Sequence, residues 1–298
     1  MRVLGIDVGG TYTKVGLVEN GQITERYEVK TDCANLFKPL VQKLPRQLWK
    51  KVDLVGISIP GFIDHQKAIV TWSGNLRLKN YDVVKHFRAA APYSGKVYVL
   101  NDANAATLGE FWRGAGANYD SIIFYTIGTG IGGGIVINGQ LVYGHQGYAG
   151  ELGHGGNFQN QVDCTCGLKH CIEPVSSAQG MERALRTANL LGSLREIKKL
   201  VGQNPQVDAV LSASLTPLAH HIATMETALN PEAIIIGGGA SALGEPFRAL
   251  LANLVKQNQL DFINRSTQIL LAQTENDAGM LGAAFWALDQ SKREALWK

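Results

Sequence analysis

The sequence predicts an α/β protein of two related domains, each built on a mixed sheet flanked by helices. Its 298 residues suffice for two domains that each bury a core. Apolar strand-like runs alternate with helix-like runs in both halves. The halves also repeat each other, because residues 16–23 resemble residues 134–141, and Gly10-Thr11 matches Gly128-Thr129 at the same offset of 118 residues. Duplication explains both matches better than chance.

The first domain is expected to span residues 1–116. Three antiparallel strands open it, and an Asn-Gly pair, which favours a type I′ turn, joins the second strand to the third. In chain order the expected elements are strands at 3–7, 14–19 and 23–29, a helix at 35–48, strands at 52–58 and 97–100, and a helix at 102–112. The glycine-rich stretch 114–118 marks the domain boundary.

The second domain is expected over residues 117–277 and repeats this order. A long insertion at 144–177 follows its hairpin. A terminal helix within 278–298 is expected to return to the first domain and complete it. The expected elements are a strand at 121–125, helices at 177–200 and 216–229, strands at 233–236 and 268–272, and a helix at 280–289.

Composition excludes several classes of partner. The net charge is +3, from 28 basic and 25 acidic residues, which is too balanced for a protein whose main partner is nucleic acid. No apolar run approaches the roughly 18 residues that span a membrane, so no membrane partner is expected. The first residues lack the layout of a signal peptide, which predicts a cytoplasmic protein.

One glycine-rich turn follows the first strand of each half, so the chain has two such turns. Their backbone N–H groups can approach phosphate oxygens, and a neighbouring hydroxyl adds a donor. Asp7, at a strand end, can hold Mg²⁺ through water, whereas Lys14 can reach a phosphate or simply be solvated. One such hairpin is weak evidence, but two copies offer two sets of donors to one polyphosphate. The candidate nucleotide-binding residues are Asp7, Gly9, Gly10, Thr11 and Lys14 in the first turn, and Thr126, Gly128, Thr129, Gly130 and Gly132 in the second.

A third glycine turn, Gly237-Gly238-Gly239, ends the buried strand at 233–236. Bare backbone at this place can admit an adenine ring, although a closely packed turn between a strand and a helix would have the same sequence. None of the three turns is a Rossmann fingerprint or a Walker A sequence.

Three of the four cysteines, Cys164, Cys166 and Cys171, fall within eight residues. In a reducing compartment such a cluster favours a metal over a disulfide. With one imidazole the three thiolates would form a closed tetrahedral Zn²⁺ site, and spacing alone leaves His154 and His170 as alternatives for the fourth ligand. Because protein atoms would fill all four positions, the zinc would be structural.

Together these motifs resemble the ROK family of sugar kinases and sugar-responsive repressors, within the actin–hexokinase–Hsp70 superfamily. The resemblance covers essentially the whole chain. It is carried by residues 7–11, 126–134 and 237–239, and by the signature at 127–154, which ends in Gly150-Glu151-Leu152-Gly153-His154. It implies two RNase H-like (actin-like ATPase) domains with the active site in the interdomain cleft, and it implies ATP and Mg²⁺ as cofactors.

Asn101-Asp102 joins a strand to a helix. By position alone, Asp102 would be the helix N-cap. A carboxylate at the carboxyl end of a strand can also accept a proton from a sugar hydroxyl during phosphoryl transfer. Similarity to the family's Asn-Asp motif implies that Asp102 is the catalytic base and that Asn101 orients the sugar.

The resemblance also implies a set of sugar contacts and selects His154 as the fourth zinc ligand, with its second ring nitrogen on a sugar hydroxyl. Carboxylates suit this task because they accept hydrogen bonds from hydroxyl groups. Beside Asn101 and Asp102, the implied sugar contacts are Gly61, Asn75, Glu151, His154 and Glu173. The chain departs from the family at His170, which stands before Cys171 in place of the usual Gly, and at Ala178, which replaces a frequent Gly.

The predicted activity is ATP-dependent phosphorylation of a hexose, with glucose as the first candidate. N-acetylhexosamines (GlcNAc or ManNAc), mannose and fructose are alternative acceptors, and polyphosphate is an alternative donor. A sugar-sensing regulator is the competing class, but the repressors carry an N-terminal helix-turn-helix for which the hairpin at residue 7 leaves no room. A chaperone- or actin-like ATPase would not need the cysteine loop. Dimers are common in the family, so a homodimer is expected.

Overall fold

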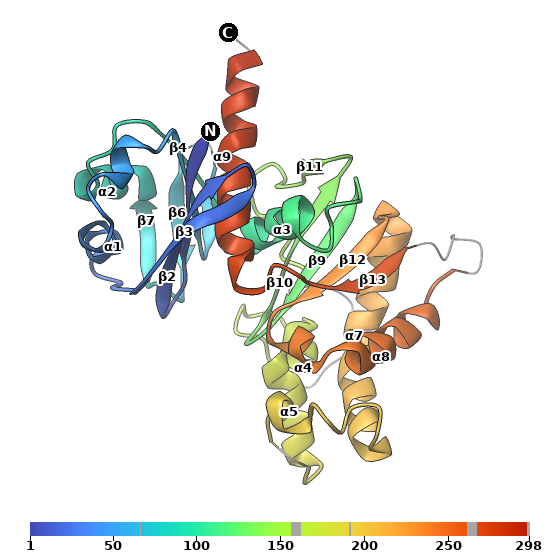
Figure 1. Ribbon diagram of the computed structural model, residues 1–298. Helices are drawn as coiled ribbons and strands as arrows, with labels where there is room; N and C mark the ends of the chain where they lie inside the picture. Colours follow the sequence, from blue (N-terminus) through green and yellow to red (C-terminus); the bar gives the residue numbers. More distant parts are fainter. Residues whose placement is uncertain (66, 156–161, 191, 261–266, 297–298) are drawn as a thin grey trace. The chain divides into compact units, whose positions relative to one another are not determined.

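The computed structural model describes residues 1–65, 67–155, 162–190, 192–260 and 267–296 (Figure 1). The chain forms two compact units. Unit 1 consists of Met1–Ala117, Leu141–Ala149 and Asn276–Lys298, and unit 2 consists of Asn118–Gln140 and Gly150–Glu275. The predicted class of α/β units with mixed sheets is confirmed.

Unit 1 is built on a five-stranded sheet of order β3-β2-β1-β4-β8. The first three strands are antiparallel, as the sequence predicts, and β4 and β8 continue from β1 in parallel. Asn20 and Gly21 join β2 to β3 with φ angles of 51° and 77°, the two positive values that a type I′ turn needs. The strands are β1 (Arg2–Val8), β2 (Tyr12–Glu19), β3 (Gln22–Lys30), β4 (Leu54–Ile59) and β8 (Lys96–Asn101).

A second, three-stranded sheet of order β5-β6-β7 follows β4, and the sequence reading missed it. Its strands are only 3 to 5 residues long, too short to show a clear alternation. They are β5 (Phe62–Asp64), β6 (Ile69–Ser73) and β7 (Leu78–Asp82). Helix α2 (Val83–Ala90) was missed as well, although the Asp82 carboxylate caps it by accepting the N–H of Lys85 at 2.9 Å.

The helix expected at 35–48 is shorter than predicted. The structure has α1 (Lys38–Lys43) and a 3₁₀ turn, η1 (Leu48–Lys50). Leu44 between them is extended, with ψ of 136°, because the following Pro45 disfavours the helical conformation at the residue before it.

Two longer helices, α3 (Asp102–Arg113) and α9 (Ala278–Leu296), complete unit 1. Helix α9 lies close against β1 and β4, because both strands carry glycine at the contact. A Cβ atom added to Gly5 would lie 2.1 Å from the carbonyl oxygen of Met280, and one added to Gly56 would lie 1.9 Å from that of Ala283. Only glycine permits this approach of helix backbone to sheet.

Segment 141–149 also packs in unit 1, whereas the sequence analysis placed all of it in the second domain, at 117–277. Aromatic side chains hold it there. Tyr148 lies edge-on to Phe62, with ring centroids 5.2 Å apart, and Tyr143 lies 6.1 Å from Trp286. The insertion is therefore divided between the units. Residues 156–161 of it lie outside the described residues.

Unit 2 repeats the strand pairing of unit 1 in a sheet of order β11-β10-β9-β12-β13. Strands β9 and β10 form an antiparallel hairpin, and β12 and β13 continue from β9 in parallel, as β4 and β8 do from β1. The shared topology supports the duplication that the internal repeat predicts. The strands are β9 (Ile122–Ile127), β10 (Ile131–Ile137), β11 (Gln140–Leu141), β12 (Ala233–Gly237) and β13 (Gln268–Leu271).

Helices cover this sheet, and three differ from the prediction. The stretch expected to be helical at 177–200 is broken after Thr187 into α5 and α6, and Ser193 caps α6. Helix α7 starts at Pro205 rather than near 216, because the Asn204 side chain accepts the N–H groups of Gln206 and Val207 and thereby caps it. Helix α8 was missed. The helical elements are α4 (Glu173–Ser176), α5 (Ala178–Thr187), α6 (Leu194–Ile197), α7 (Pro205–Leu229), η2 (Gly239–Leu243), α8 (Glu245–Lys256) and, at the boundary, η3 (Glu275–Asp277).

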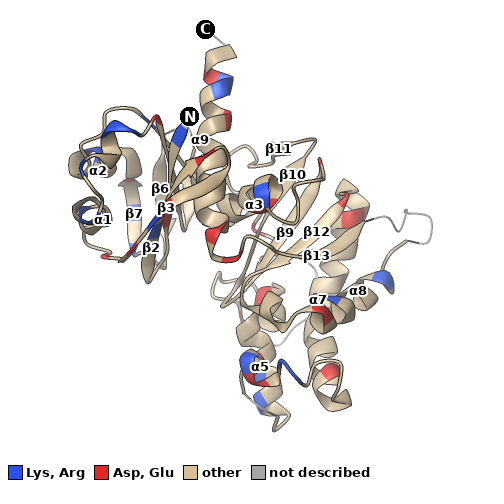
Figure 2. Ribbon diagram, viewed as in Figure 1, with Lys and Arg blue, Asp and Glu red and all other residues tan. Residues whose placement is uncertain are grey.

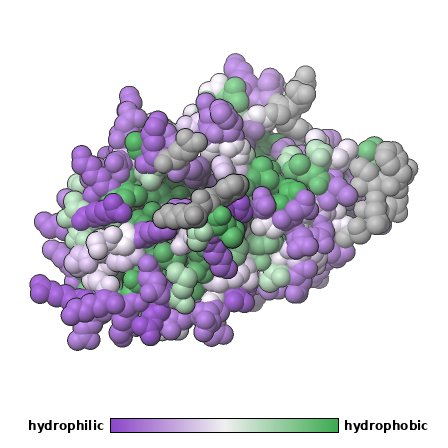
Figure 3. All heavy atoms as spheres, turned by 90° about the horizontal axis from the view of Figure 1, so that it is seen from above, coloured by the Kyte–Doolittle hydropathy of each residue, from purple (hydrophilic) through white to green (hydrophobic). Residues whose placement is uncertain are grey.

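Charged residues are distributed as the balanced composition predicts. Figure 2 shows both signs on α9 and β3, whereas β9, β12 and β13 are free of charge. Hydrophilic side chains cover most of the face in Figure 3, with hydrophobic ones in separate groups. Within the described ranges, no helix has the length and apolar character needed to cross a membrane.

Candidate active site and metal centre

Hydrogen bonds fix the backbone of the first glycine turn at Gly9, while its Gly10–Thr11 side is open to solvent. The N–H of Gly9 donates to the carbonyl of Tyr12 at 3.0 Å, and the Thr31 hydroxyl donates to the Gly9 carbonyl at 2.7 Å. Thr11 is exposed. A Cβ atom added to Gly10 would meet nothing within 4 Å. A rigid turn with open backbone can take up phosphate oxygens.

Asp7 lies at the end of β1, beside this turn. The Ser58 hydroxyl donates to its Oδ1 at 2.9 Å, and Gly279 packs so closely that an added Cβ would lie 2.4 Å from the Asp7 Cγ. Burial raises the pKa of Asp7, while the Ser58 hydrogen bond and Lys14 lower it. A divalent cation held through water would favour the ionised carboxylate here. The Lys14 ammonium donates to the side chain of Asn276 at 3.1 Å.

The sequence reading missed Ser58, Asn276 and Gly279, which surround these residues. Ser58 had a signal, because it is the polar residue in an otherwise apolar and fully buried strand. Asn276 lies in η3 and Gly279 in the first turn of α9, both far away in sequence, so only the fold reveals their contacts.

The side chain of Asn101 connects the start of α3, where Asp102 lies, to the backbone of Gly61. Asn101 is the N-cap of α3, because its Oδ1 accepts the N–H groups of Ala103 at 2.8 Å and Asn104 at 3.1 Å. Its Nδ2 donates to the carbonyl of Gly61 at 3.1 Å. Capping therefore belongs to Asn101 and not to Asp102. Asp102 is half-buried in the first turn of α3, where its Oδ1 accepts the N–H of Ala103 at 3.0 Å.

Gly61 and Asn75 belong to the region of the small sheet. Gly61 has a φ of 124°, and an added Cβ would lie 2.4 Å from the carbonyl oxygen of Trp72, so no other residue fits there without strain. Asn75 is exposed in the turn after β6, two residues beyond Ser73, which also packs against Gly61. The turn leaves the Asn75 amide accessible to a ligand.

The second glycine turn is bound to Glu173. One carboxylate oxygen of Glu173 accepts the N–H of Ile131 at 2.9 Å and lies 2.3 Å from the place of a Cβ on Gly130. Gly128 resembles Gly10, since an added Cβ would meet nothing within 4 Å. Thr129 is exposed. A predicted sugar contact thus also stabilises a predicted phosphate turn.

The third glycine turn lies beside the second in unit 2. Gly237 pairs with Thr126 across the sheet, as Gly132 does from the other side. Gly238, with a φ of 77°, packs on the backbone of Ile127. Gly239 has open space where a Cβ would be. The candidate adenosine and phosphate residues of unit 2 therefore lie next to one another, where β9 and β12 end.

Glu151 and His154 lie on the segment that packs against the start of β10. An added Cβ on Gly153 would lie 2.3 Å from the carbonyl oxygen of Ile131. Desolvation raises the pKa of the Glu151 carboxyl, His154 lowers it and the nearby Glu173 raises it further. The segment and Glu173 are joined by the hydrogen bond from the Glu173 N–H to the Gly153 carbonyl at 3.1 Å.

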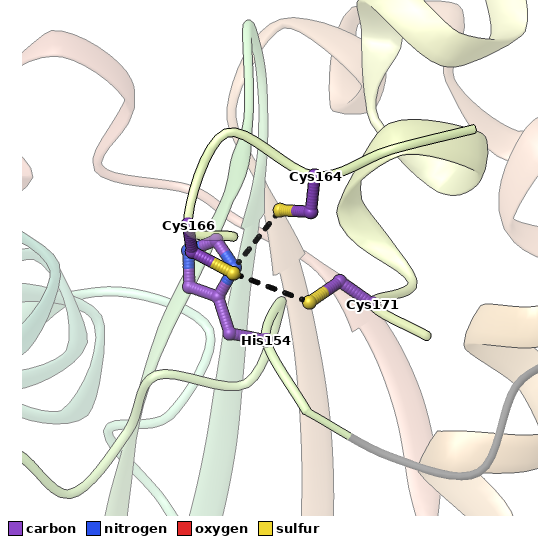
Figure 4. A group of neighbouring side chains, drawn as sticks. All are labelled: His154, Cys164, Cys166 and Cys171. Carbon is purple, nitrogen blue, oxygen red and sulfur yellow. Dashed lines mark hydrogen bonds between the residues drawn. The ribbon is translucent and has the colours of Figure 1, made fainter. Parts of the chain in front are cut away.

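Four potential metal ligands converge in unit 2 (Figure 4). The ligand atoms of His154, Cys164, Cys166 and Cys171 all lie within 4.8 Å of one another. The Cys164 sulfur lies 3.5 Å from the His154 Nδ1, and the Cys166 and Cys171 sulfurs are 3.5 Å apart. Ligands at the corners of a tetrahedron with Zn–S of about 2.3 Å are about 3.8 Å apart. One imidazole and three thiols at these distances fit a structural zinc ion, and the group contains His154 rather than His170.

Known proteins match over nearly the whole chain. The family model described as "ROK family" matches residues 3–290. A glucokinase of Thermotoga maritima is 33% identical over 95% of this chain and 96% of its own. An N-acetylmannosamine kinase of Haemophilus influenzae is 30% identical over 97% of this chain and 96% of its own. The crystal structure of a ROK family glucokinase from Streptomyces griseus, in complex with glucose and AMPPNP, has a TM-score of 0.80 at 27% identity and covers 97% of this chain and 100% of its own.

Proposed function

This chain belongs to the ROK family and is a sugar kinase, and we propose that it transfers the γ-phosphoryl group of ATP to a hydroxyl of glucose. The similarity to glucokinases at up to 33% identity supports glucose. The N-acetylmannosamine kinases match at up to 30%, so N-acetylated hexosamines are the second candidate class of acceptor.

One observation carries the proposal: Asn101 caps α3, which places Asp102 in the first turn of the helix, directly beside this fixed cap. The same Asn101 side chain binds Gly61, so cap, base and the turn at Gly61 form one rigid group. In our proposal the Asp102 carboxylate accepts the proton of the sugar hydroxyl that attacks phosphorus. Because phosphoryl transfer has a loose transition state, holding the base in place matters more than its strength.

The nucleotide would be bound by the three glycine turns. Gly9, Gly10 and Thr11 from unit 1 and residues 126–132 from unit 2 would donate backbone and hydroxyl hydrogen bonds to the phosphates. Gly237, Gly238 and Gly239 would receive the adenosine. Asp7 would hold Mg²⁺ through water, and that ion would neutralise charge on the transferred phosphoryl group. Lys14 would add a positive charge beside it.

Sugar recognition would use side chains of both units. Gly61, Asn75 and Asn101 of unit 1 and Glu151, His154 and Glu173 of unit 2 would hydrogen-bond the hydroxyls. One oxygen of Glu173 already accepts the Ile131 N–H, so its second oxygen would meet the sugar. His154 would bind zinc through Nδ1, the atom that faces Cys164, and the sugar through Nε2.

None of the four cysteines, all of them described residues, is joined in a disulfide, which suits a reducing compartment, and we infer a cytoplasmic location. A homodimer in solution is a further part of the proposal, tested by light scattering on the purified chain. The proposed role as an enzyme also distinguishes this chain from a sugar-sensing regulator, which would bind sugar without releasing ADP.

The proposal is tested by measuring ADP release with a panel of hexoses and N-acetylhexosamines, using ATP and polyphosphate as donors. We expect a signal that requires sugar and is largest with glucose and ATP. Asp102→Asn should reduce kcat by about a thousandfold or more. Asp82→Asn is the matched control, because Asn is an equally good cap for α2 and should leave kcat unchanged. Full activity of Asp102→Asn would disprove the assignment of the base.

A further inference from the structure

Unit 1 contains a cavity of about 460 Å³ that includes none of the residues assigned above to the kinase reaction. Three parts of the chain line it: the β5–β6 hairpin, segment 141–149 and α9. Its volume lies in the range of small-molecule sites.

Aromatic rings form much of its wall. The rings of His65, Tyr143 and Trp286 are mutual neighbours, with centroid distances of 5.6 Å, 6.1 Å and 6.1 Å. Tyr143 and Tyr148 are 43% and 37% exposed, which is unusual for side chains of this size and leaves their faces open to a ligand. Flat aromatic faces bind the apolar C–H faces of a ring, and the tyrosine hydroxyls can bind its polar rim.

Polar groups stand among these rings. Both ring nitrogens of His65 are buried, and the carbonyls of Val99 and Gly147 lie close to the ring. The imidazole of His145 also lines the cavity and is exposed. The side-chain amide of Gln290 and the carboxylate of Asp64 add further donors and acceptors.

The cavity offers no fixed positive charge. None of the described residues that line it is Lys or Arg. Burial lowers the pKa of His65, which favours the neutral form of this ring. Asp64 is the acidic group, and its partner Lys67, with the ammonium 3.2 Å from the carboxylate, does not line the cavity. This lining favours an uncharged polyhydroxyl ligand and disfavours a phosphate ester.

We propose that this cavity is a second binding site for a neutral, unphosphorylated sugar. Aromatic faces with carboxylate, amide and imidazole groups between them match the two kinds of surface that a pyranose presents. Because the lining has no Lys or Arg to pair with a phosphate, the cavity would favour the unphosphorylated sugar over its phosphate ester. The inference requires no catalytic step and does not rest on the assignment of Asp102.

The test is calorimetric titration of the full chain with glucose in the absence of ATP, with amide hydrogen exchange as a second readout. We expect glucose to protect segment 141–149 and the residues of α9 around Gln290. The double variant Tyr143→Ala, Gln290→Ala should lose this protection and one bound sugar per chain, with kcat unchanged. Tyr119→Ala, a half-buried tyrosine of unit 2, is the matched control and should lose neither. Glucose 6-phosphate should bind the cavity at least about tenfold more weakly.

Two results would overturn the inference: glucose gives no protection of segment 141–149, or the double variant binds glucose with unchanged stoichiometry and protection. Because binding is measured without ATP, the outcome is separate from that of the proposed function. A chain that protects segment 141–149 with glucose but shows no sugar-dependent ADP release would contradict only the kinase proposal.

Discussion

Gly10, Gly128 and Gly239 share one property, and each lies in a different glycine turn. An added Cβ would meet nothing within 4 Å, and none of the three has the positive φ that reserves a position for glycine. Neither space nor backbone conformation inside the protein therefore requires glycine at these positions. Close approach of a ligand to the backbone is the remaining physical reason for it.

Gly10→Ala should therefore separate folding from nucleotide binding. We expect a melting temperature close to that of the wild type, since the methyl group meets open space and Ala has the lower unfolded-state entropy. The KM for ATP should rise by about tenfold or more, because the methyl group stands where a phosphate would approach. Steady-state kinetics at varied ATP, with calorimetry for stability, measure both effects.

Gly238→Ala is the matched comparison for this substitution. Its φ is 77°, and the added Cβ would lie 2.6 Å from the Ile127 carbonyl oxygen, so stability itself should fall. If Gly10→Ala left the KM for ATP unchanged while folding normally, the first turn would not bind the phosphates.

At the scale of elements, α4 and the glutamate that begins it join the cysteine loop to the second glycine turn. Glu173 follows Cys171 by two residues, and its carboxylate holds the N–H of Ile131. Gly155 donates its N–H to the Cys171 sulfur at 3.3 Å. A metal ion that fixes Cys171 would thus also fix the position of Glu173.

Zinc removal should therefore weaken sugar binding as well as stability. We expect about one zinc per chain by elemental analysis. A strong chelator that removes the zinc should lower the melting temperature, because the free energy of metal binding stabilises the folded loop. Cys164→Ser should give the same fall and raise the KM for sugar more than the KM for ATP. The reason is Glu173, a proposed sugar contact whose position depends on the metal-bound Cys171.

Cys33→Ser serves as the control for the cysteine substitution, since Cys33 is exposed and lies outside the metal-ligand group. It should retain zinc, stability and both KM values. A wild-type chain that folds fully and contains no zinc would contradict the assignment of a metal centre.

At the scale of the whole molecule, the same sheet topology occurs in both units and places a glycine turn between the first two strands of each sheet. In unit 1 this topology depends on the contact of α9 with the strands, and α9 comes from the opposite end of the sequence. The glycines of β1 and β4 make the contact possible. The fold of unit 1 therefore requires nearly the full length of the chain.

Gly56→Ala should destabilise unit 1, because its Cβ would lie 1.9 Å from the carbonyl oxygen of Ala283 and α9 would have to move. We expect a loss of about 3 kcal/mol in the free energy of unfolding. Urea unfolding followed by circular dichroism measures it. Gly192→Ala, where the nearest atom is a flexible side-chain carbon of Arg186 at 3.4 Å, should change stability little. Equal stability of the two variants would show that α9 tolerates displacement.

The sequence alone determined the strand–turn–strand units and the duplication, because these depend on local periodicity and on turn residues such as Asn20-Gly21. The local spacing of Cys164, Cys166 and Cys171 also marked them as metal ligands, whereas His154 was selected over His170 by the family resemblance; the structure groups His154 with the three cysteines. It could not show the small β5–β6–β7 sheet, whose strands are held by pairing rather than by strong alternation.

Only the tertiary structure decided that the Asn101 side chain reaches the Gly61 carbonyl, where segment 141–149 packs, and that Ser58 and Gly279 enclose Asp7. The aromatic cavity likewise depends on residues from three distant parts of the chain. The physical reason is the same in each case. Hydrogen bonding and ring packing between residues far apart in sequence depend on atomic distances, and those distances are set by packing of the complete unit rather than by local preference.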